Sequence, residues 1–182
     1  MTAALLAANR RTFSSLRKHR NYRLFFGGQV VSVTGTWMQN VATAWLVLAL
    51  TGSPLAVGVL AVVQFLPFTL FSLPAGVLLD RLDARRTVVT TQALSLALAS
   101  TLAALTLGGV VEVWHVYAVT ALRGIVLVLD NPARQALTFE MVGRDELSNA
   151  VALNSSLFNA ARVVGPAAGG VTVAAASASA SR

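Results

Sequence analysis

Long apolar runs separated by short polar stretches dominate the chain. A helix that crosses a bilayer needs about 20 mostly apolar residues, at about 1.5 Å of rise each. The runs that qualify or nearly qualify cover residues 24–50, 55–79, 88–111, 114–129 and 150–173. Only helices and closed barrels satisfy their backbone in lipid, and these uninterrupted runs lack the alternation of barrel strands. The pattern therefore predicts an all-α fold, a polytopic transmembrane helical bundle.

The composition favours the same class. Charged residues make up 12% of the chain, against about 25% in soluble domains. A net charge of +7 can indicate a nucleic-acid partner, but here the basic residues lie in short clusters between apolar runs, as membrane loops do. The chain has no cysteine, and its two histidines, His19 and His115, lie far apart in the sequence. We therefore expect no nucleic-acid partner, no metal site and no cofactor.

The positions of lysine and arginine predict the orientation. They occur before the first run, after the second and after the fourth, and the alternate connections carry none. By the positive-inside rule the N-terminus is cytoplasmic, in a multi-pass protein of the cell (inner) membrane. Three segments follow: a basic cytoplasmic segment 1–23, a transmembrane bundle 24–173 and an Ala/Ser-rich tail 174–182. Segment 1–23 either lies on the membrane surface or forms a solvated tail.

Polar residues inside the first run recur at three- and four-residue spacing, which places them on one helix face. They form either a cavity wall or a set of interhelical hydrogen-bonding groups, and both interpretations stay open. The residues are Gln29, Ser32, Thr36, Gln39 and Thr43.

Two arginines lie inside apolar runs, Arg123 in the fourth and Arg162 in the fifth. An arginine at bilayer depth costs about 2.5–3.5 kcal/mol on insertion scales, so each requires a partner or water. The role of each is functional or purely structural. The candidates for a cavity or gate are Gln29, Thr36, Gln39, Arg123 and Asp130.

The loop after the second run carries a recognisable motif. It reads Gly76-Val-Leu-Leu-Asp80-Arg81-Leu-Asp83-Ala84-Arg85-Arg86. This resembles the signature between the second and third helices of the major facilitator superfamily. Glycine permits close helix packing, and Asp80 is placed to cap the next helix or to pair with a base. The family pattern has Gly and Arg where this chain has Asp83 and Ala84, which leaves Arg85 as the candidate for the missing charge.

The fifth run resembles the antiporter motif of the same superfamily. It contains Arg162-Val-Val-Gly165-Pro166-Ala-Ala-Gly169-Gly170. The related arginine motif of the fourth helix is partly present, since Arg123 fits but Leu127 replaces an expected glycine. Further segments resemble the enterobactin-exporter-like branch over residues 16–170. They are Asn21-Tyr-Arg-Leu, Gly35-Thr-Trp37-Met-Gln39, Leu50-Thr-Gly-Ser-Pro54-Leu, Asp130-Asn-Pro132-Ala-Arg134-Gln-Ala and Asn149-Ala-Val-Ala-Leu-Asn154-Ser-Ser.

The resemblance implies a secondary active transporter that exports a small molecule, by proton antiport. Its partners are then a small-molecule substrate, protons and the lipid bilayer. The alternative is a non-transporting membrane scaffold or assembly protein. An integral-membrane enzyme is disfavoured because the sequence offers no acid–base or nucleophile–base constellation. Members of the superfamily have two similar helical halves with substrate between them, so we expect this chain to be a truncated N-terminal part.

Two local arrangements are predicted. Asp80, Arg85 and Asp130 should cluster at the inner ends of the second and fourth helices. In the fifth helix, Pro166 should cause a kink by removing a backbone hydrogen bond, and the alternative is an ordinary membrane helix with little bend. Gly165, Gly169 and Ala161 lie one turn apart and should give a smooth face for the first or another N-terminal helix, while Arg162 should point into the bundle.

Overall fold

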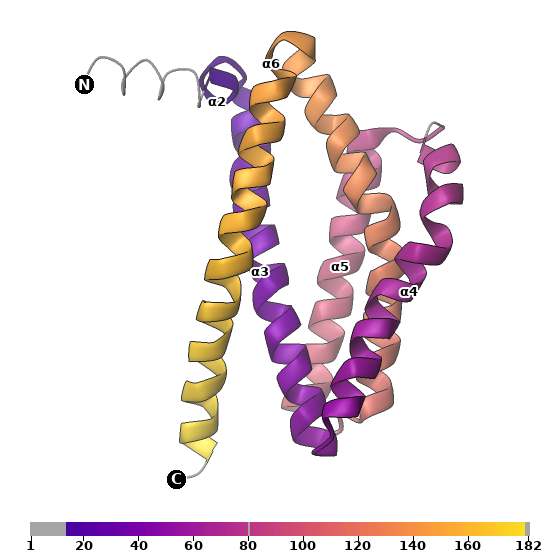
Figure 1. Cartoon of the computed structure of the whole chain (residues 1–182), viewed down its shortest axis with the longest axis vertical. Helices are drawn as coiled ribbons and strands as arrows, with labels where there is room; N and C mark the ends of the chain where they lie inside the picture. Colours follow the sequence, from indigo (N-terminus) through magenta and orange to yellow (C-terminus); the bar gives the residue numbers. More distant parts are fainter. Residues whose placement is uncertain (1–13, 80, 181–182) are drawn as a thin grey trace, which may run out of the picture. The chain divides into compact units, whose positions relative to one another are not determined.

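The computed structural model describes residues 14–79 and 81–180, and no strand occurs within these ranges. Their helices are α2 (Ser14–Lys18), α3 (Arg20–Thr51), α4 (Pro54–Leu79), α5 (Ala84–Leu107) and α6 (Val113–Ala180). Figure 1 shows them in chain order. The predicted all-α class is confirmed.

Helix α6 consists of two helices joined at a sharp turn. Gly143 has φ 68° and ψ −175°, a conformation that residues with a Cβ rarely adopt. The turn divides α6 into helical segments 113–142 and 144–180. The polar stretch between the fourth and fifth apolar runs, from Asp130 to Ser148, is helical apart from Gly143. A helix can extend beyond the bilayer into water without losing backbone hydrogen bonds, so polarity alone did not mark its end.

Three helical stretches are long and apolar enough to cross a membrane, judged by length and composition within the described residues: Pro54–Gly76, Ala84–Leu107 and Val113–Thr172. The third spans 60 residues, far more than the roughly 20 of one crossing, and the Gly143 turn divides it. Helix α3 is not among these stretches. Large apolar side chains such as Leu55, Leu73 and Leu107 are highly exposed, as expected of a membrane helical bundle.

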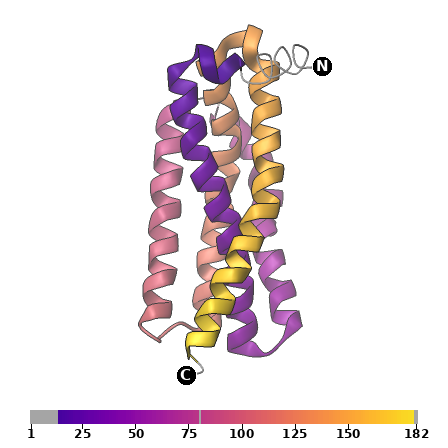
Figure 2. The same cartoon turned by 90° about the vertical axis from the view of Figure 1, so that its left-hand side faces the viewer.

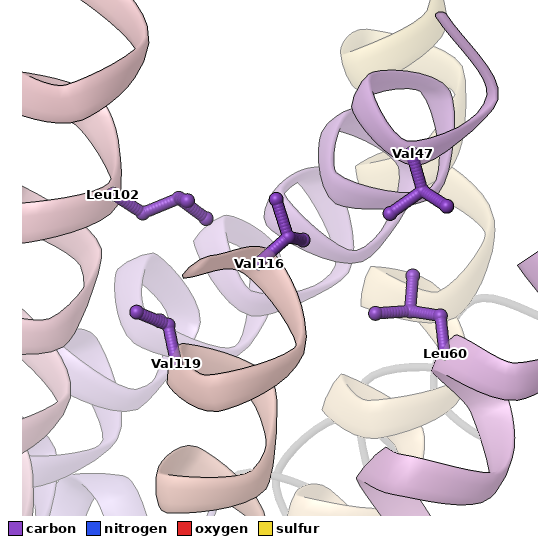
Figure 3. Packing of buried hydrophobic residues seen from close by; sticks show 5 residues of the cluster. All are labelled: Val47, Leu60, Leu102, Val116 and Val119. Atoms are coloured by element: carbon purple, nitrogen blue, oxygen red, sulfur yellow. The ribbon is translucent and has the colours of Figure 1, made fainter. Parts of the chain in front are cut away.

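The chain divides into two compact units. The second unit, Thr43–Leu137, is built from the end of α3, from α4 and α5, and from the first half of α6. Its core joins all four helices (Figure 3). The buried members of this core are Val47, Leu60, Leu102, Val116 and Val119.

The described part of the first unit combines α2, residues 20–42 of α3 and residues 138–180 of α6. Its core contains Tyr22, Val142, Ala150 and Leu153. Tyr22 hydrogen-bonds to the carbonyl of Ala150 at 3.2 Å, and further along α3 Met38 lies against Gly169. Residue numbers rise in the same direction along both helices, so residues 20–42 of α3 and segment 144–180 run parallel, side by side (Figures 1 and 2).

Candidate functional site

The predicted motif residues at the end of α4 and in the α4–α5 loop have different environments. Asp80 lies outside the described residues. Asp83, not Asp80, caps α5, because its side chain accepts a hydrogen bond of 2.7 Å from the backbone N–H of Arg86. Gly76 is exposed, and a Cβ there would meet no atom within 4 Å. The structure therefore shows no close helix approach at Gly76.

The loop arginines are all exposed, but they differ in position. Arg81 and Arg86 line a groove between α5 and segment 113–142, and Arg85 does not. The groove also contains Asp83, threonines of α5 and apolar side chains of both helices. It lies wholly within the second unit.

Asp130 is the centre of a buried polar cluster in the second unit. Its carboxylate accepts hydrogen bonds from Thr91 Oγ1 at 2.6 Å and from Gln92 Nε2 at 3.1 Å. Arg134, one turn further along α6, pairs with the other carboxylate oxygen at 2.6 Å. Both carboxylate oxygens of Asp130, which is only 3% exposed, thus accept hydrogen bonds, and Arg134 compensates the negative charge.

This arrangement corrects the predicted cluster. Asp130 pairs with Arg134 rather than with Arg85, whose side chain is exposed to solvent. The four-residue spacing of Asp130 and Arg134 could have revealed this pair from sequence. Thr91 and Gln92 lie in an apolar run and reach Asp130 only through tertiary contact.

The antiporter-like motif contacts α3 through its glycines. A Cβ on Gly165 would lie 2.4 Å from Cβ of Trp37 and 3.1 Å from the carbonyl oxygen of Thr34. A Cβ on Gly169 would lie 3.2 Å from the carbonyl oxygen of Met38. Ala161, one turn earlier, is also buried. The smooth face predicted for these residues is therefore the one that packs on α3.

The rest of the motif is arranged differently. Gly170 is exposed, and a Cβ added to it would meet no atom within 4 Å. Within α6 the backbone leaves helical dihedral angles at Gly143, whereas Pro166 keeps them. The predicted distortion at Pro166 thus does not interrupt the helix.

Arg162 lies beside the aromatic part of this contact. Its Cζ is 6.0 Å from the ring centroid of Trp37, within the range of a cation–π interaction. Trp37 also meets Phe158 edge to face at 5.9 Å. The Arg162 side chain is exposed in this chain, whereas the indole Nε1 of Trp37 is buried with no hydrogen-bond partner among the described residues.

The remaining candidates differ in burial. Gln29 is buried, and Thr36 and Gln39 are half-buried, so the stripe on α3 is largely covered. Arg123 is also half-buried. Its neighbour Gly124, which sequence reasoning missed, marks a close contact with α4. A Cβ at Gly124 would lie only 2.8 Å from the carbonyl oxygen of Gln64.

Helix α2 is docked on the start of segment 144–180. Ser14 and Lys18 bind the carboxylate of Glu146. Ser15 is fully buried and hydrogen-bonds to the side chain of Asn149 at 2.7 Å. The hydrogen bonds from Lys18 and then Ser14 lower the pKa of Glu146. Residues 14–18 of the basic segment 1–23 are therefore bound to the start of segment 144–180. The charge pattern of the sequence did not reveal this contact.

Known proteins resemble this chain over most of its length. A family described as "Transmembrane secretion effector" matches residues 10–181. The staphyloferrin A transporter of Staphylococcus aureus is 28% identical over 84% of this chain and 38% of its own length. Macrolide efflux protein A of Streptococcus pyogenes is 27% identical over 84% of this chain and 38% of its own length. The multidrug efflux pump Tap of Mycolicibacterium fortuitum is 30% identical over 77% of this chain and 36% of its own length.

The chain thus spans less than two-fifths of the length of these relatives, each matching over 38% or less. No solved structure matches it.

Proposed function

Because the chain belongs to the transmembrane secretion effector family of the major facilitator superfamily, we propose that it is part of a secondary active transporter that exports a small molecule across the cytoplasmic membrane by proton antiport. The partners of this activity are the small-molecule substrate, protons and the bilayer. The N-terminus is cytoplasmic in this proposal, since the basic residues cluster before α3 and in the loop between α4 and α5.

The proposal rests mainly on one observation: the antiporter-like motif meets a neighbouring helix through two glycines. Gly165 and Gly169 bring segment 144–180 against the backbone of α3 at Thr34 and Met38. Small residues at a helix contact let the two backbones approach closely, and here the side chain of Trp37 lies directly against Gly165. Such a contact suits a helix pair that shifts during alternating access.

The names of two relatives support the direction of transport. Macrolide efflux protein A and the multidrug efflux pump Tap are described as efflux proteins, and the staphyloferrin A transporter is described as a transporter. A small molecule is the substrate class that we carry over to this chain.

The experiment measures flux in everted membrane vesicles that contain the chain within its complete open reading frame. The probes are a labelled macrolide and the fluorescent cation ethidium. Uptake into energised vesicles that stops when a protonophore collapses the proton gradient supports the proposal. Correct membrane insertion without gradient-dependent uptake of either probe, or of other amphiphilic compounds, would overturn it and favour a non-transporting scaffold.

A further inference from the structure

The groove between α5 and segment 113–142, called the α5–α6 groove below, is not explained by substrate transport. Its volume is about 610 Å³, within the range of sites that hold a drug-sized ligand. Arg81, Leu82 and Asp83 of the α4–α5 loop contribute to its lining. From the geometry and charge of its walls, we propose that the α5–α6 groove binds an anionic glycerophospholipid of the surrounding bilayer.

The walls change character along the helix axis. Arg81 and Arg86 lie at the loop end of the groove, and Thr87 and Thr90 follow in the next turn. Leu94 lies eight residues after Arg86, about 12 Å further along the helix at 1.5 Å per residue. On segment 113–142, Ile125, Val126 and Leu129 complete the wall. A cationic end, a hydroxyl zone and an apolar zone follow one another, as do the phosphate, glycerol esters and acyl chain of a phospholipid.

The charges at the groove favour an anion. Two arginines face one carboxylate, Asp83, and that carboxylate already accepts the N-cap hydrogen bond of α5. Below them, the charge of Asp130 is compensated by Arg134 at 2.6 Å. Basic pockets between membrane helices near the bilayer surface are known binding places for anionic lipid head groups. Among the described residues that line the groove, the arginines therefore outnumber the carboxylates by two to one, which favours an anion.

The apolar wall identifies a lipid rather than a free anion. Leu94 and Ile125 are 49% and 46% exposed, although both lie in helices apolar enough to span a membrane. A free phosphate ion would leave these side chains uncovered, whereas an acyl chain would cover them. A bound lipid would also bridge α5 and segment 113–142 beside Thr91, whose hydroxyl binds Asp130. Lipid binding should therefore stabilise the contact between these two helices.

The loop supplies a matched control for the test. Arg85 lies one residue from Arg86 and carries the same charge, but it does not line the groove. The 182-residue chain is purified in zwitterionic detergent and titrated with phosphatidylglycerol, and bound lipid is counted by native mass spectrometry. Phosphatidylcholine and free glycerol phosphate are titrated in parallel. Circular dichroism verifies that every variant is equally helical.

We expect Arg81→Gln and Arg86→Gln each to weaken phosphatidylglycerol binding about fivefold, the equivalent of about 1 kcal/mol per arginine. Arg85→Gln should bind as the parent chain does. Ile125→Trp, which fills the apolar zone without changing charge, should weaken binding as well. Equal losses for all three arginine variants would mean general attraction to a basic surface and would overturn the site. Tight binding of glycerol phosphate, or unchanged binding by Ile125→Trp, would overturn the lipid assignment.

Discussion

Replacing Gly165 by alanine probes the tightest point of the contact between α3 and segment 144–180. The added Cβ would lie 2.4 Å from Cβ of Trp37 and 3.4 Å from the backbone nitrogen of Met38. Two carbon atoms in contact normally stand about 3.5–4.0 Å apart. The backbone on both sides is helical and cannot swing away as a flexible side chain does, so the helices must separate locally by roughly 1 Å.

The expected change in stability is the sum of two opposing contributions, the cost of overpacking and the gain in helix propensity. Overpacking of a tight site typically costs about 1–3 kcal/mol. Exchanging glycine for alanine inside a helix returns about 1 kcal/mol. Gly35→Ala is the matched control, because Gly35 lies on α3 with no atom within 4 Å of its would-be Cβ. We expect Gly35→Ala to be neutral or stabilising by up to about 1 kcal/mol, with Gly165→Ala less stable than it by about 1–3 kcal/mol.

The assay is unfolding of the detergent-solubilised chain by increasing sodium dodecyl sulfate, followed by far-UV circular dichroism. Both variants carry the same chemical change in a helix, so differences in propensity cancel and the midpoint difference reports the packing at Trp37. The same midpoint for both variants would refute the close contact, and with it the basis for assigning a conformational role to Gly165.

Three further outcomes are expected. In Glu146→Gln the backbone amides of α2 should exchange hydrogen faster at pH 7, because Lys18 loses its ionic partner. In the parent chain the docking of α2 should persist at neutral pH. It should weaken only when the pH falls through the lowered pKa of Glu146 and the carboxylate is protonated. Asp130→Ala should destabilise the chain by about 3 kcal/mol in the same detergent titration, because it removes the buried carboxylate that pairs with Arg134 and accepts hydrogen bonds from Thr91 and Gln92, and a loss below the error of that titration would contradict the role of the cluster. The chain lacks cysteine, so a single introduced cysteine can report topology in intact cells. A membrane-impermeant maleimide should label Ser53→Cys from outside the cell, and it should label Leu82→Cys only after permeabilisation. The reverse labelling pattern would contradict the proposed orientation.

The helical content could be read from sequence because it depends on local hydropathy. The second apolar run, 55–79, and helix α4, Pro54–Leu79, nearly share their bounds. Helix α5 starts four residues before the third run, at Ala84, because Asp83 caps it. Hydropathy does not register a capping residue. It also could not show the helical stretch around Asn131 and Arg134, where polar residues continue a helix.

The partners of the candidate residues depended on tertiary contacts and were only partly predictable. The one-turn spacing of Gly165 and Gly169 correctly indicated a smooth helix face, because that follows from helix geometry. The partner of Asp130 was predicted from distant loop charges, whereas a residue one turn away and a threonine of α5 provide it. Which polar groups meet across two helices depends on their rotation and register, and neither is set by the sequence of one helix.

The central claim is that the Gly165 contact belongs to a transport cycle. The most direct test compares Gly165→Leu with Gly58→Leu in the complete open reading frame, at equal membrane abundance, by proton-gradient-driven uptake into everted vesicles. Gly58, on α4, has no atom within 4 Å of a would-be Cβ, so a leucine there adds the same bulk without a clash. We predict normal membrane insertion of both variants, loss of uptake in Gly165→Leu and retained uptake in Gly58→Leu. Uptake by Gly165→Leu at the level of the parent protein would contradict it.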